Sequence, residues 1–302
     1  MIVAVLGANG QLGSDILRLA AASDDEFKTL ALTRKDLDVR DLSSIPAVLS
    51  KFQFDVLVNC TGYHKTDEVE EHATEAFRIN AHAVAALAKA CKSRGARFVQ
   101  ISTDYVFDGR SRRPYVETDS ASPVNVYGSS KLLGERLAIR EYDEGTLIAR
   151  VASLFGVAGS SGKGGNFVET ILWKAKETGE VRVVNDITMS PTSTADAARL
   201  ILTLLEKEAP VGIYHVVNSG SATWFEFARQ IVEEAELRAN VVPTTSGEYP
   251  TVAVRPMYTA LDNGKISQIV GEIPHWGDAL RVYLMKKGHV PVAQTHTLRA
   301  GG

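Results

Sequence analysis

The sequence contains little cysteine, no strong excess of charge and no long apolar run. Its two cysteines, Cys60 and Cys91, have no metal-like spacing. Two cysteines without a disulfide framework indicate a reducing compartment, so we expect a cytoplasmic protein. The net charge of −3 at pH 7 gives no reason to expect nucleic acid or an anionic membrane as a partner.

The start of the chain resembles neither a signal peptide nor a membrane span. The apolar stretch Ile2–Leu6 is very short and no basic region precedes it. With 45% hydrophobic and 23% charged residues, the composition is that of an ordinary globular protein. A length of 302 residues is enough for one large domain or two modest ones.

The chain opens with a predicted strand, a glycine turn and a helix. The run Ile2–Leu6 predicts a buried strand, and a helical pattern follows Gly13. Glycines let the backbone approach a pyrophosphate, and a helix N-terminus offers it free N–H groups. The alternative is a glycine-rich turn without a ligand. The expected cofactor contacts in this turn are Gly7, Asn9, Gly10, Gln11, Leu12 and Gly13.

The end of the second predicted strand, Thr29–Thr33, indicates which dinucleotide binds. An acid there would bind the ribose 2′-hydroxyl of NADH, whereas the basic pair Arg34-Lys35 can hold a 2′-phosphate. We therefore expect NADPH in preference to NADH. The residues that follow, Asp38 and Val39, are expected beside the adenine.

A third predicted strand, Asp55–Cys60, leads into Thr61, Gly62 and Tyr63, which should pass beneath the cofactor. One long helix is expected from about Glu75 to Ser93, and it contains Asn80. This asparagine is interpreted either as a surface residue or as a structural residue beside the site.

A fourth predicted strand, Arg97–Ile101, delivers Thr103 and Asp104 to the edge that carries the glycine turn. A helix then opens with Tyr127 and Lys131, which share one face because they are four residues apart. A neighbouring ammonium favours the phenolate and should lower the pKa of Tyr127 from about 10 toward neutrality. The spacing alone is weak evidence.

That weakness is visible within the chain, because Tyr283 and Lys287 repeat the same spacing. The context of Tyr127 is more specific. Strands alternate with helices through Val151, which predicts an α/β fold with a doubly wound parallel sheet of the Rossmann type.

Three regions are expected. Residues 1–155 form the dinucleotide-binding domain, with parts of 185–217 returning to the sheet, residues 156–287 form mainly a smaller substrate-binding lobe, and residues 288–302 form a tail. The glycine-rich segment 156–165 departs from a Walker A motif at Val157 and Gly164, so we expect a mobile loop on the substrate side.

Several stretches together resemble the dTDP-4-dehydrorhamnose reductase family of extended short-chain dehydrogenases, in family order from residue 1 to about 280. They are GANGQLG (7–13), STDYVFDG (102–109), PVNVYGSSKLLGE (123–135), RVASLFG (150–156), GNFVETIL (165–172), SPT (190–192), TWFEFA (223–228) and RPMYTALD (255–262). The resemblance implies NADPH- or NADH-dependent reduction of the C4 keto group of a nucleotide-linked sugar, namely dTDP-4-dehydro-L-rhamnose.

The resemblance also implies roles for the candidate residues. Tyr127 protonates the carbonyl oxygen, Lys131 lowers its pKa and binds the nicotinamide ribose, Thr103 donates to the oxyanion, and Asp104 supports the site. The matching stretches suggest substrate contacts on the sugar side at Val106, Phe107, Ser153, Asn166 and Arg255.

Departures from the family pattern fall on that sugar side. Ser153 stands where many members have a tryptophan, and Ile187 and Met189 also differ. His64 and Lys65 are interpreted either as contacts to a substrate phosphate or as two solvated loop residues. Tyr105 follows Asp104 where related dehydratases carry a second acid, which disfavours dehydration. The exact sugar and nucleotide therefore stay open.

Two other functions remain as alternatives. The regulatory subunit of methionine adenosyltransferase shares the scaffold as a non-catalytic binding protein, but Thr103, Tyr127 and Lys131 would be superfluous there. A sugar-nucleotide epimerase would hold NAD permanently, which Arg34 disfavours. No metal ligands are identified, and the resemblance leaves a Mg²⁺ requirement open and admits a homodimer.

Overall fold

The computed structural model describes residues 1–23, 26–159 and 165–290. Its central element is a six-stranded parallel sheet in the order β10-β5-β4-β3-β1-β2. The strands are β1 (Ile2–Leu6), β2 (Lys28–Leu32), β3 (Val56–Asn59), β4 (Arg97–Thr103), β5 (Thr146–Val151) and β10 (Gly212–His215). This topology confirms the predicted doubly wound α/β fold.

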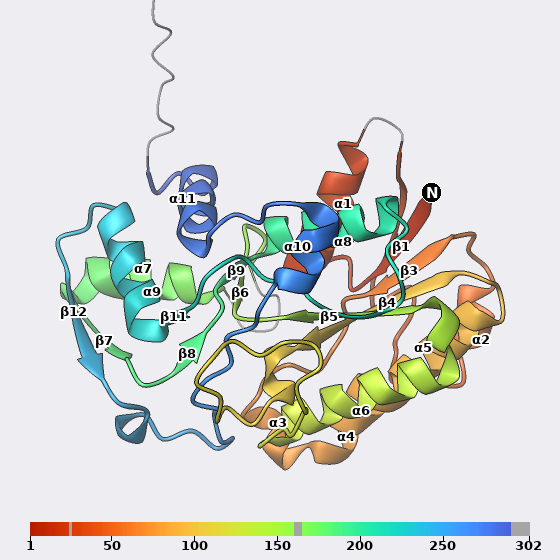
Figure 1. Cartoon of the computed structure of the whole chain (residues 1–302), viewed down its shortest axis with the longest axis horizontal. Helices are drawn as coiled ribbons and strands as arrows, with labels where there is room; N and C mark the ends of the chain where they lie inside the picture. Colours follow the sequence, from red (N-terminus) through yellow and green to blue (C-terminus); the bar gives the residue numbers. More distant parts are fainter. Residues whose placement is uncertain (24–25, 160–164, 291–302) are drawn as a thin grey trace, which may run out of the picture.

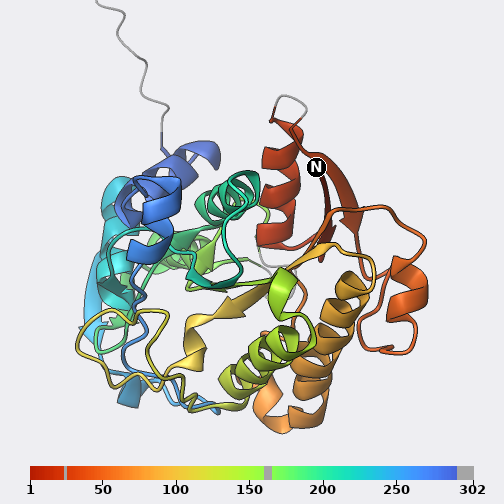
Figure 2. The ribbon, with the colours of Figure 1, turned by 45° about the vertical axis from the view of Figure 1, so that its right-hand side comes forward.

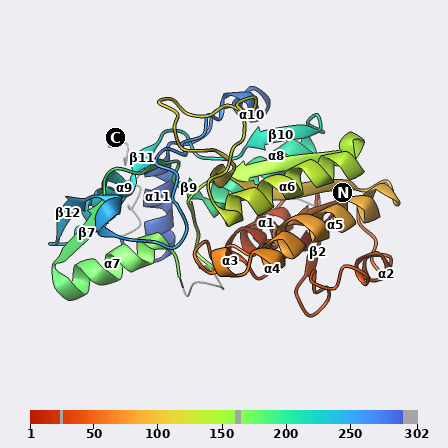
Figure 3. The same cartoon turned by 90° about the horizontal axis from the view of Figure 1, so that it is seen from below.

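Helices cover both faces of this sheet (Figures 1 and 3). The helices α1 (Gln11–Ala21), α8 (Thr194–Glu206) and α10 (Gly264–Val270) lie on one face. The opposite face carries α2 (Ile45–Leu49), α5 (Ala83–Lys92) and α6 (Val126–Glu141). The central strands read as continuous apolar runs because both of their faces are buried.

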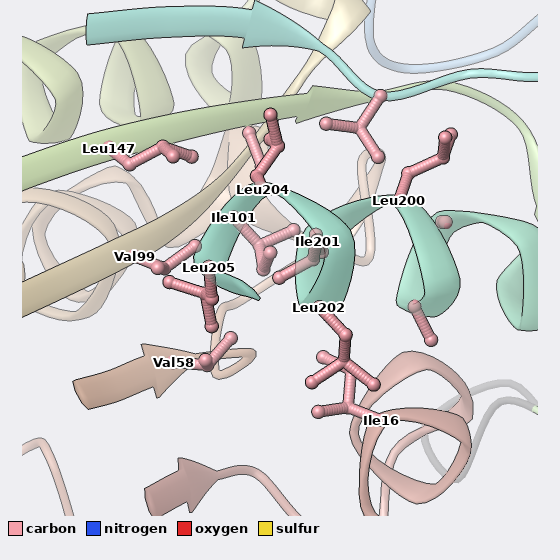
Figure 4. Close-up of a cluster of buried hydrophobic side chains, with 14 of the residues drawn as sticks. Ile16, Val58, Val99, Ile101, Leu147, Leu200, Ile201, Leu202, Leu204 and Leu205 are labelled. Atoms are coloured by element: carbon pink, nitrogen blue, oxygen red, sulfur yellow. The ribbon is translucent and has the colours of Figure 1, made fainter. Parts of the chain in front are cut away.

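The α8 side of the core follows from helical periodicity (Figure 4). Ile201, Leu204 and Leu205 are buried against strand residues that include Val99 and Leu147. Residues spaced three and four apart form one apolar stripe. Each fully buried aliphatic side chain of this kind contributes about 1.5–3 kcal/mol relative to exposure. α8 thus belongs to the sheet, although it follows the substrate-side segment in sequence.

The helix expected from about Glu75 to Ser93 is helical throughout but not uniform. It consists of α4 (Ala73–Phe77), a π-helical turn at Arg78–His82, and α5. The wider turn contains Asn80, whose carbonyl oxygen would lie 2.1 Å from a Cβ atom built on Gly134 of α6. Close approach of α6 to the widened turn therefore requires glycine at this point.

The second lobe packs around its own apolar cluster beside the sheet (Figures 1 and 2). Its helices are α7 (Phe167–Thr178), α9 (Trp224–Glu234) and α11 (Trp276–Lys286), joined by the parallel strand pair β7 (Glu180–Val184) and β12 (Asn240–Thr244). The remaining strands are short: β6 (Leu154–Phe155), β8 (Thr188–Met189), β9 (Thr192–Ser193) and β11 (Ala222–Thr223). A one-turn helix, α3 (Glu68–Glu71), precedes α4.

A capping box opens α9, with the Thr223 side chain accepting from the Glu226 N–H and the Glu226 side chain accepting from the Thr223 N–H. Within the described part of the chain, every helix is too short or too polar to cross a bilayer. The predicted mobile loop and tail fall largely on residues 160–164 and 291–302, which lie outside the described residues.

Candidate active site

A cavity of about 690 Å³ opens at the carboxyl ends of β1 and β3. Gly7, Asn9 and Gly10 line it from the first turn. Gly7 has a φ of +87°, which disfavours any larger residue. A Cβ atom on Gly13 would lie 2.4 Å from the Gly7 carbonyl oxygen, so the glycine is needed for the turn to pack against α1.

The start of α1 faces the same region without a side-chain cap. Its N-cap residue is Gly10, which provides no side-chain hydrogen bond to the first N–H groups. The side-chain oxygen Oε1 of Gln11 is buried and has no hydrogen-bond partner within the described structure. Uncapped N–H groups at a helix N-terminus suit a phosphate.

The far end of this cavity carries two arginines and one aspartate. Arg34, Asp38, Val39 and Arg40 all line it, whereas Lys35 is exposed and does not. The second cation of the cavity is therefore Arg40 and not Lys35 as predicted. The reason is local geometry, because the loop after β2 returns Arg40 to the Asp38 carboxylate.

Asn80 supports the cavity from behind instead of contacting its interior. It is 1% exposed. Its Oδ1 accepts from the Tyr63 N–H at 2.8 Å, and its Nδ2 donates to the Tyr63 carbonyl at 3.0 Å and to Ser130 Oγ at 3.0 Å. Of its two interpretations, the structural role is confirmed, and the predicted direct cofactor contact is corrected. Thr61, Gly62 and Tyr63 do line the cavity.

A second cavity, of about 380 Å³, adjoins the first through Gly10, Cys60, Thr61 and Gly62, which line both. Its lining brings together the four candidate catalytic residues and four residues of the glycine turn. The candidates are Thr103, Asp104, Tyr127 and Lys131, and the turn residues are Gly10, Gln11, Leu12 and Gly13.

Helix α6 places Tyr127 and Lys131 on the cavity wall. The helix begins after Asn125, whose side chain caps it by accepting from the Gly128 N–H at 2.8 Å. Lys131 is 6% exposed, and its Nζ donates to the Ile101 carbonyl at 2.6 Å. This contact joins the helix to the end of β4.

The pKa of Tyr127 moves opposite to the predicted direction. Burial raises it to about 12, and a hydrogen bond with Thr103 opposes this rise only in part. Burial also lowers the pKa of Lys131 to about 8, against the attraction of the Glu135 carboxylate. The Asp104 carboxylate adds to the rise caused by desolvation. The Lys131 ammonium is directed at the Ile101 carbonyl instead.

Asp104 is a buried carboxylate in this cavity. The Thr103 hydroxyl donates to its Oδ1 at 2.9 Å, while its Oδ2 has no hydrogen-bond partner within the described structure. Burial raises its pKa to about 6. Thr103 therefore already uses its single proton when Asp104 is ionised.

Two of the five predicted substrate contacts are incorrect. Val106 and Phe107 are fully buried, and Phe107 stacks on Tyr115 with ring centroids 4.1 Å apart. The short 3₁₀ turn Asp104–Val106 turns both side chains into the core beneath the site. Tyr105, which the sequence did not single out as a contact, lines the second cavity instead.

Ser153 and Asn166 line the second cavity, and Arg255 lines a third one of about 510 Å³. Ser153 has a φ of 43°, a strained value for a non-glycine residue. The aromatic residues Phe167 and Trp224, with ring centroids 4.6 Å apart, line both cavities. Both residues lie in stretches that resemble the family, 165–172 and 223–228, but their contact was not predicted, because they come from separate elements of the second lobe.

The described residues contain no group of three or more His, Cys, Asp or Glu side chains that could hold a metal ion. The question of Mg²⁺ therefore receives no support from side-chain geometry here.

Comparison with known proteins gives one family and consistent relatives. The family model described as "RmlD substrate binding domain" matches residues 1–288. The spore coat polysaccharide biosynthesis protein SpsK of Bacillus subtilis is 38% identical over 285 residues, covering 94% of this chain and 97% of that protein. The dTDP-4-keto-6-deoxy-D-glucose reductase of Streptomyces niveus is 34% identical, covering 91% and 94%.

The solved structures include dTDP-4-dehydrorhamnose reductase from Bacillus anthracis in complex with NADP. That chain is 33% identical to this one, with a TM-score of 0.87, and the match covers 94% of this chain and 99% of the other.

Proposed function

The chain belongs to the RmlD substrate binding domain family, and from that membership we propose that it reduces the C4 keto group of a nucleotide-linked sugar with NADPH or NADH. As a member of this family it is an oxidoreductase resembling dTDP-4-dehydrorhamnose reductase. We propose dTDP-4-dehydro-L-rhamnose as its substrate. The observation that carries the proposal is that Thr103, Tyr127 and Lys131 line one cavity together with the glycine turn.

The residues present suit a nicotinamide dinucleotide. The uncapped start of α1 offers backbone N–H groups to a pyrophosphate. Arg34 and Arg40 offer positive charge at the other end of the cavity, where an NADPH 2′-phosphate would lie. We therefore propose NADPH as the preferred cofactor, consistent with the NADP named for the Bacillus anthracis relative.

A bound nicotinamide supplies a hydride to the carbonyl carbon. Tyr127 then donates its proton to the carbonyl oxygen as negative charge develops there. With a pKa of about 12 the phenol is protonated at neutral pH, as a general acid must be. The Lys131 ammonium provides positive charge beside the reacting oxygen and favours the phenolate that Tyr127 becomes.

Thr103 lines the same cavity as Tyr127, and its hydroxyl donates to the Asp104 carboxylate. It would donate to the sugar carbonyl only when this bond to Asp104 is released. The second lobe, with Asn166 and Ser153 at the wall, would cover the sugar. We assign the neighbouring cavity to the nucleoside diphosphate. Its lining combines the cations Lys174, Arg182 and Arg255 with apolar and aromatic side chains.

A second candidate substrate is another 4-keto-6-deoxy sugar nucleotide. The Streptomyces niveus relative is named for dTDP-4-keto-6-deoxy-D-glucose. Ser153 places a small side chain on the cavity wall near the sugar. This suits a sugar whose shape differs from that of dehydrorhamnose. A panel of nucleotide 4-keto sugars, followed by NADPH oxidation at fixed enzyme concentration, distinguishes the substrates.

The catalytic assignment is tested by Tyr127→Phe. Loss of the only proton donor at the carbonyl oxygen should lower kcat by about 10²–10⁴-fold, while cofactor affinity changes little. NADPH oxidation with dTDP-4-dehydro-L-rhamnose measures the rate, and fluorescence titration measures NADPH affinity.

The matched control is Tyr142→Phe, at the distal end of the same helix. It should retain the wild-type rate. Full activity of Tyr127→Phe would exclude the proposed acid, whereas an inactive wild type with every keto sugar of the panel would exclude the proposed reaction.

A further inference from the structure

A single carboxylate holds both arginines of the cofactor cavity. Asp38 Oδ2 lies 2.5 Å from Arg40 Nη2 and 3.3 Å from Arg34 Nε. Arg40 Nε also contacts both carboxylate oxygens at 3.0 Å. The hydrogen bond from Arg40 is the main reason that the pKa of Asp38 lies far below its usual range, so the carboxylate is ionised.

This ion cluster lies where the two dinucleotides differ. The glycine turn lines one part of the cavity, and Arg34, Asp38 and Arg40 line the part beyond β2. If the pyrophosphate lies at the start of α1, the adenosine ribose reaches this second part. NADPH and NADH differ only in the 2′-phosphate carried by that ribose.

We propose that Asp38 sets the preference between NADPH and NADH by occupying the two arginines that the 2′-phosphate requires. The inference depends on the proposed dinucleotide cofactor but not on the identity of the sugar. A phosphate and the Asp38 carboxylate compete for the N–H groups that now face Asp38, namely Nε and Nη2 of Arg40 and Nε of Arg34.

The competition weakens the binding of NADPH more than that of NADH, because only NADPH carries the 2′-phosphate. Without Asp38, Arg34 and Arg40 would face the ribose without their shared ion-pair partner and would favour the phosphate more strongly. With Asp38, the difference between the two cofactors is reduced. Glu68 and Glu75 also line the cavity, and Glu75 interacts with Arg40.

The test is Asp38→Asn. Asparagine keeps an oxygen in the position that now accepts from the Arg40 N–H at 3.1 Å, so the turn is retained while the charge is removed. The probes are 2′,5′-ADP and ADP, which carry and lack the 2′-phosphate, measured by calorimetry at low salt. We expect 2′,5′-ADP to bind about tenfold tighter to the variant and ADP to change by less than about twofold.

The matched control is Asp36→Asn. Asp36 lies two residues earlier and contacts Thr33 instead, through the Thr33 N–H and hydroxyl at 2.8 Å each. It removes the same unit of charge without releasing an arginine. The gain for 2′,5′-ADP should be less than about twofold if contact, and not general charge, is responsible.

Arg40→Gln provides the opposite change. It should weaken 2′,5′-ADP by about tenfold and leave ADP within about twofold. Equal weakening of both probes by Asp38→Asn would overturn the proposal in favour of the adenine contact that the sequence predicts for Asp38. An unchanged ratio of the two affinities would overturn it as well.

The experiments distinguish failure of the proposed reaction from failure of the inference about Asp38. If the probes behave as expected but no keto sugar is reduced, the cofactor inference stands and the reaction is wrong. If neither probe binds the wild-type protein, both the cofactor and this inference are wrong.

Discussion

At the scale of single residues, Asp104 is an anion placed where ionisation is costly. It is 3% exposed, and one of its oxygens has no hydrogen-bond partner in the described structure. Its pKa rises from 3.8 to about 6 on burial, so the folded protein holds the proton more tightly than the unfolded chain. Its contribution to stability is therefore lost as pH rises from about 4 to about 6.

Asp104→Asn should remove the loss of stability that ionisation of the buried Asp104 carboxyl causes. At pH 8 we expect the free energy of unfolding to exceed that of the wild type by about 1–2 kcal/mol, because no buried charge remains. At pH 4.5 the difference should be much smaller, since the wild-type carboxyl is then protonated in the folded state. Urea unfolding of both proteins at the two pH values measures it.

The variant should lose activity while gaining stability, because the Thr103 hydroxyl loses its charged acceptor. If the stability difference between the two proteins does not change with pH, the pKa of Asp104 is the same in the folded and the unfolded chain.

Lys131 gives the site an alkaline limit. Burial lowers its pKa to about 8, and above this value the ammonium is lost from the site. We expect kcat/KM to fall about tenfold per pH unit above pH 8, since the pH profile of kcat/KM reports the free enzyme. Tyr127, with a pKa of about 12, cannot cause this decline.

The residual activity of Lys131→Arg serves as the control, because arginine stays charged over the same range and should remove the decline. A wild-type profile that stays flat to pH 10 would contradict the role of the Lys131 charge.

At the scale of elements, one ion pair joins the three elements that carry the reaction. The Glu135 carboxylate of α6 accepts from Ser102 of β4 and from Arg150 of β5, with Arg150 Nη2 at 2.7 Å and Nε at 2.9 Å. Both side chains of the pair are at most 3% exposed. The pair thereby fixes α6, with Tyr127 and Lys131, against the strand that ends in Thr103.

Glu135→Gln should be strongly destabilising, because it leaves the Arg150 guanidinium buried without its counter-charge. We expect the free energy of unfolding to fall by about 3–5 kcal/mol. Denaturant unfolding measures the change. Glu248→Gln, which breaks the exposed pair with Arg182, is the control and should cost less than about 0.5 kcal/mol.

A change of similar small size in both variants would mean that water solvates Arg150 when Glu135 is neutral. In that case the pair would not be what orders α6 against β4.

At the scale of the whole molecule, the cleft combines contributions from distant parts of the chain. The sheet provides the glycine turn and the strand ends, and the second lobe provides Asn166, Phe167 and Trp224. The division into a cofactor-binding part and a sugar-covering part stays a prediction. This prediction is based on the second cavity, which is lined by residues of both the sheet and the second lobe.

The sequence by itself determined the order of strands and helices through Val151, the glycine turn, and the position of Tyr127 and Lys131 on one helix. These depend on short-range periodicity and on backbone freedom at Gly7 and Gly13, which a single stretch of sequence carries.

Only the tertiary structure decided which side chains face the cleft. It exchanged Lys35 for Arg40, placed Phe107 in the core, and put Asn80 behind the cavity wall. It also showed that the environment of Tyr127 raises its pKa, where the spacing to Lys131 predicted a lowering. Burial and hydrogen-bond direction depend on residues far apart in sequence, so the local pattern that locates a catalytic pair cannot fix its electrostatics.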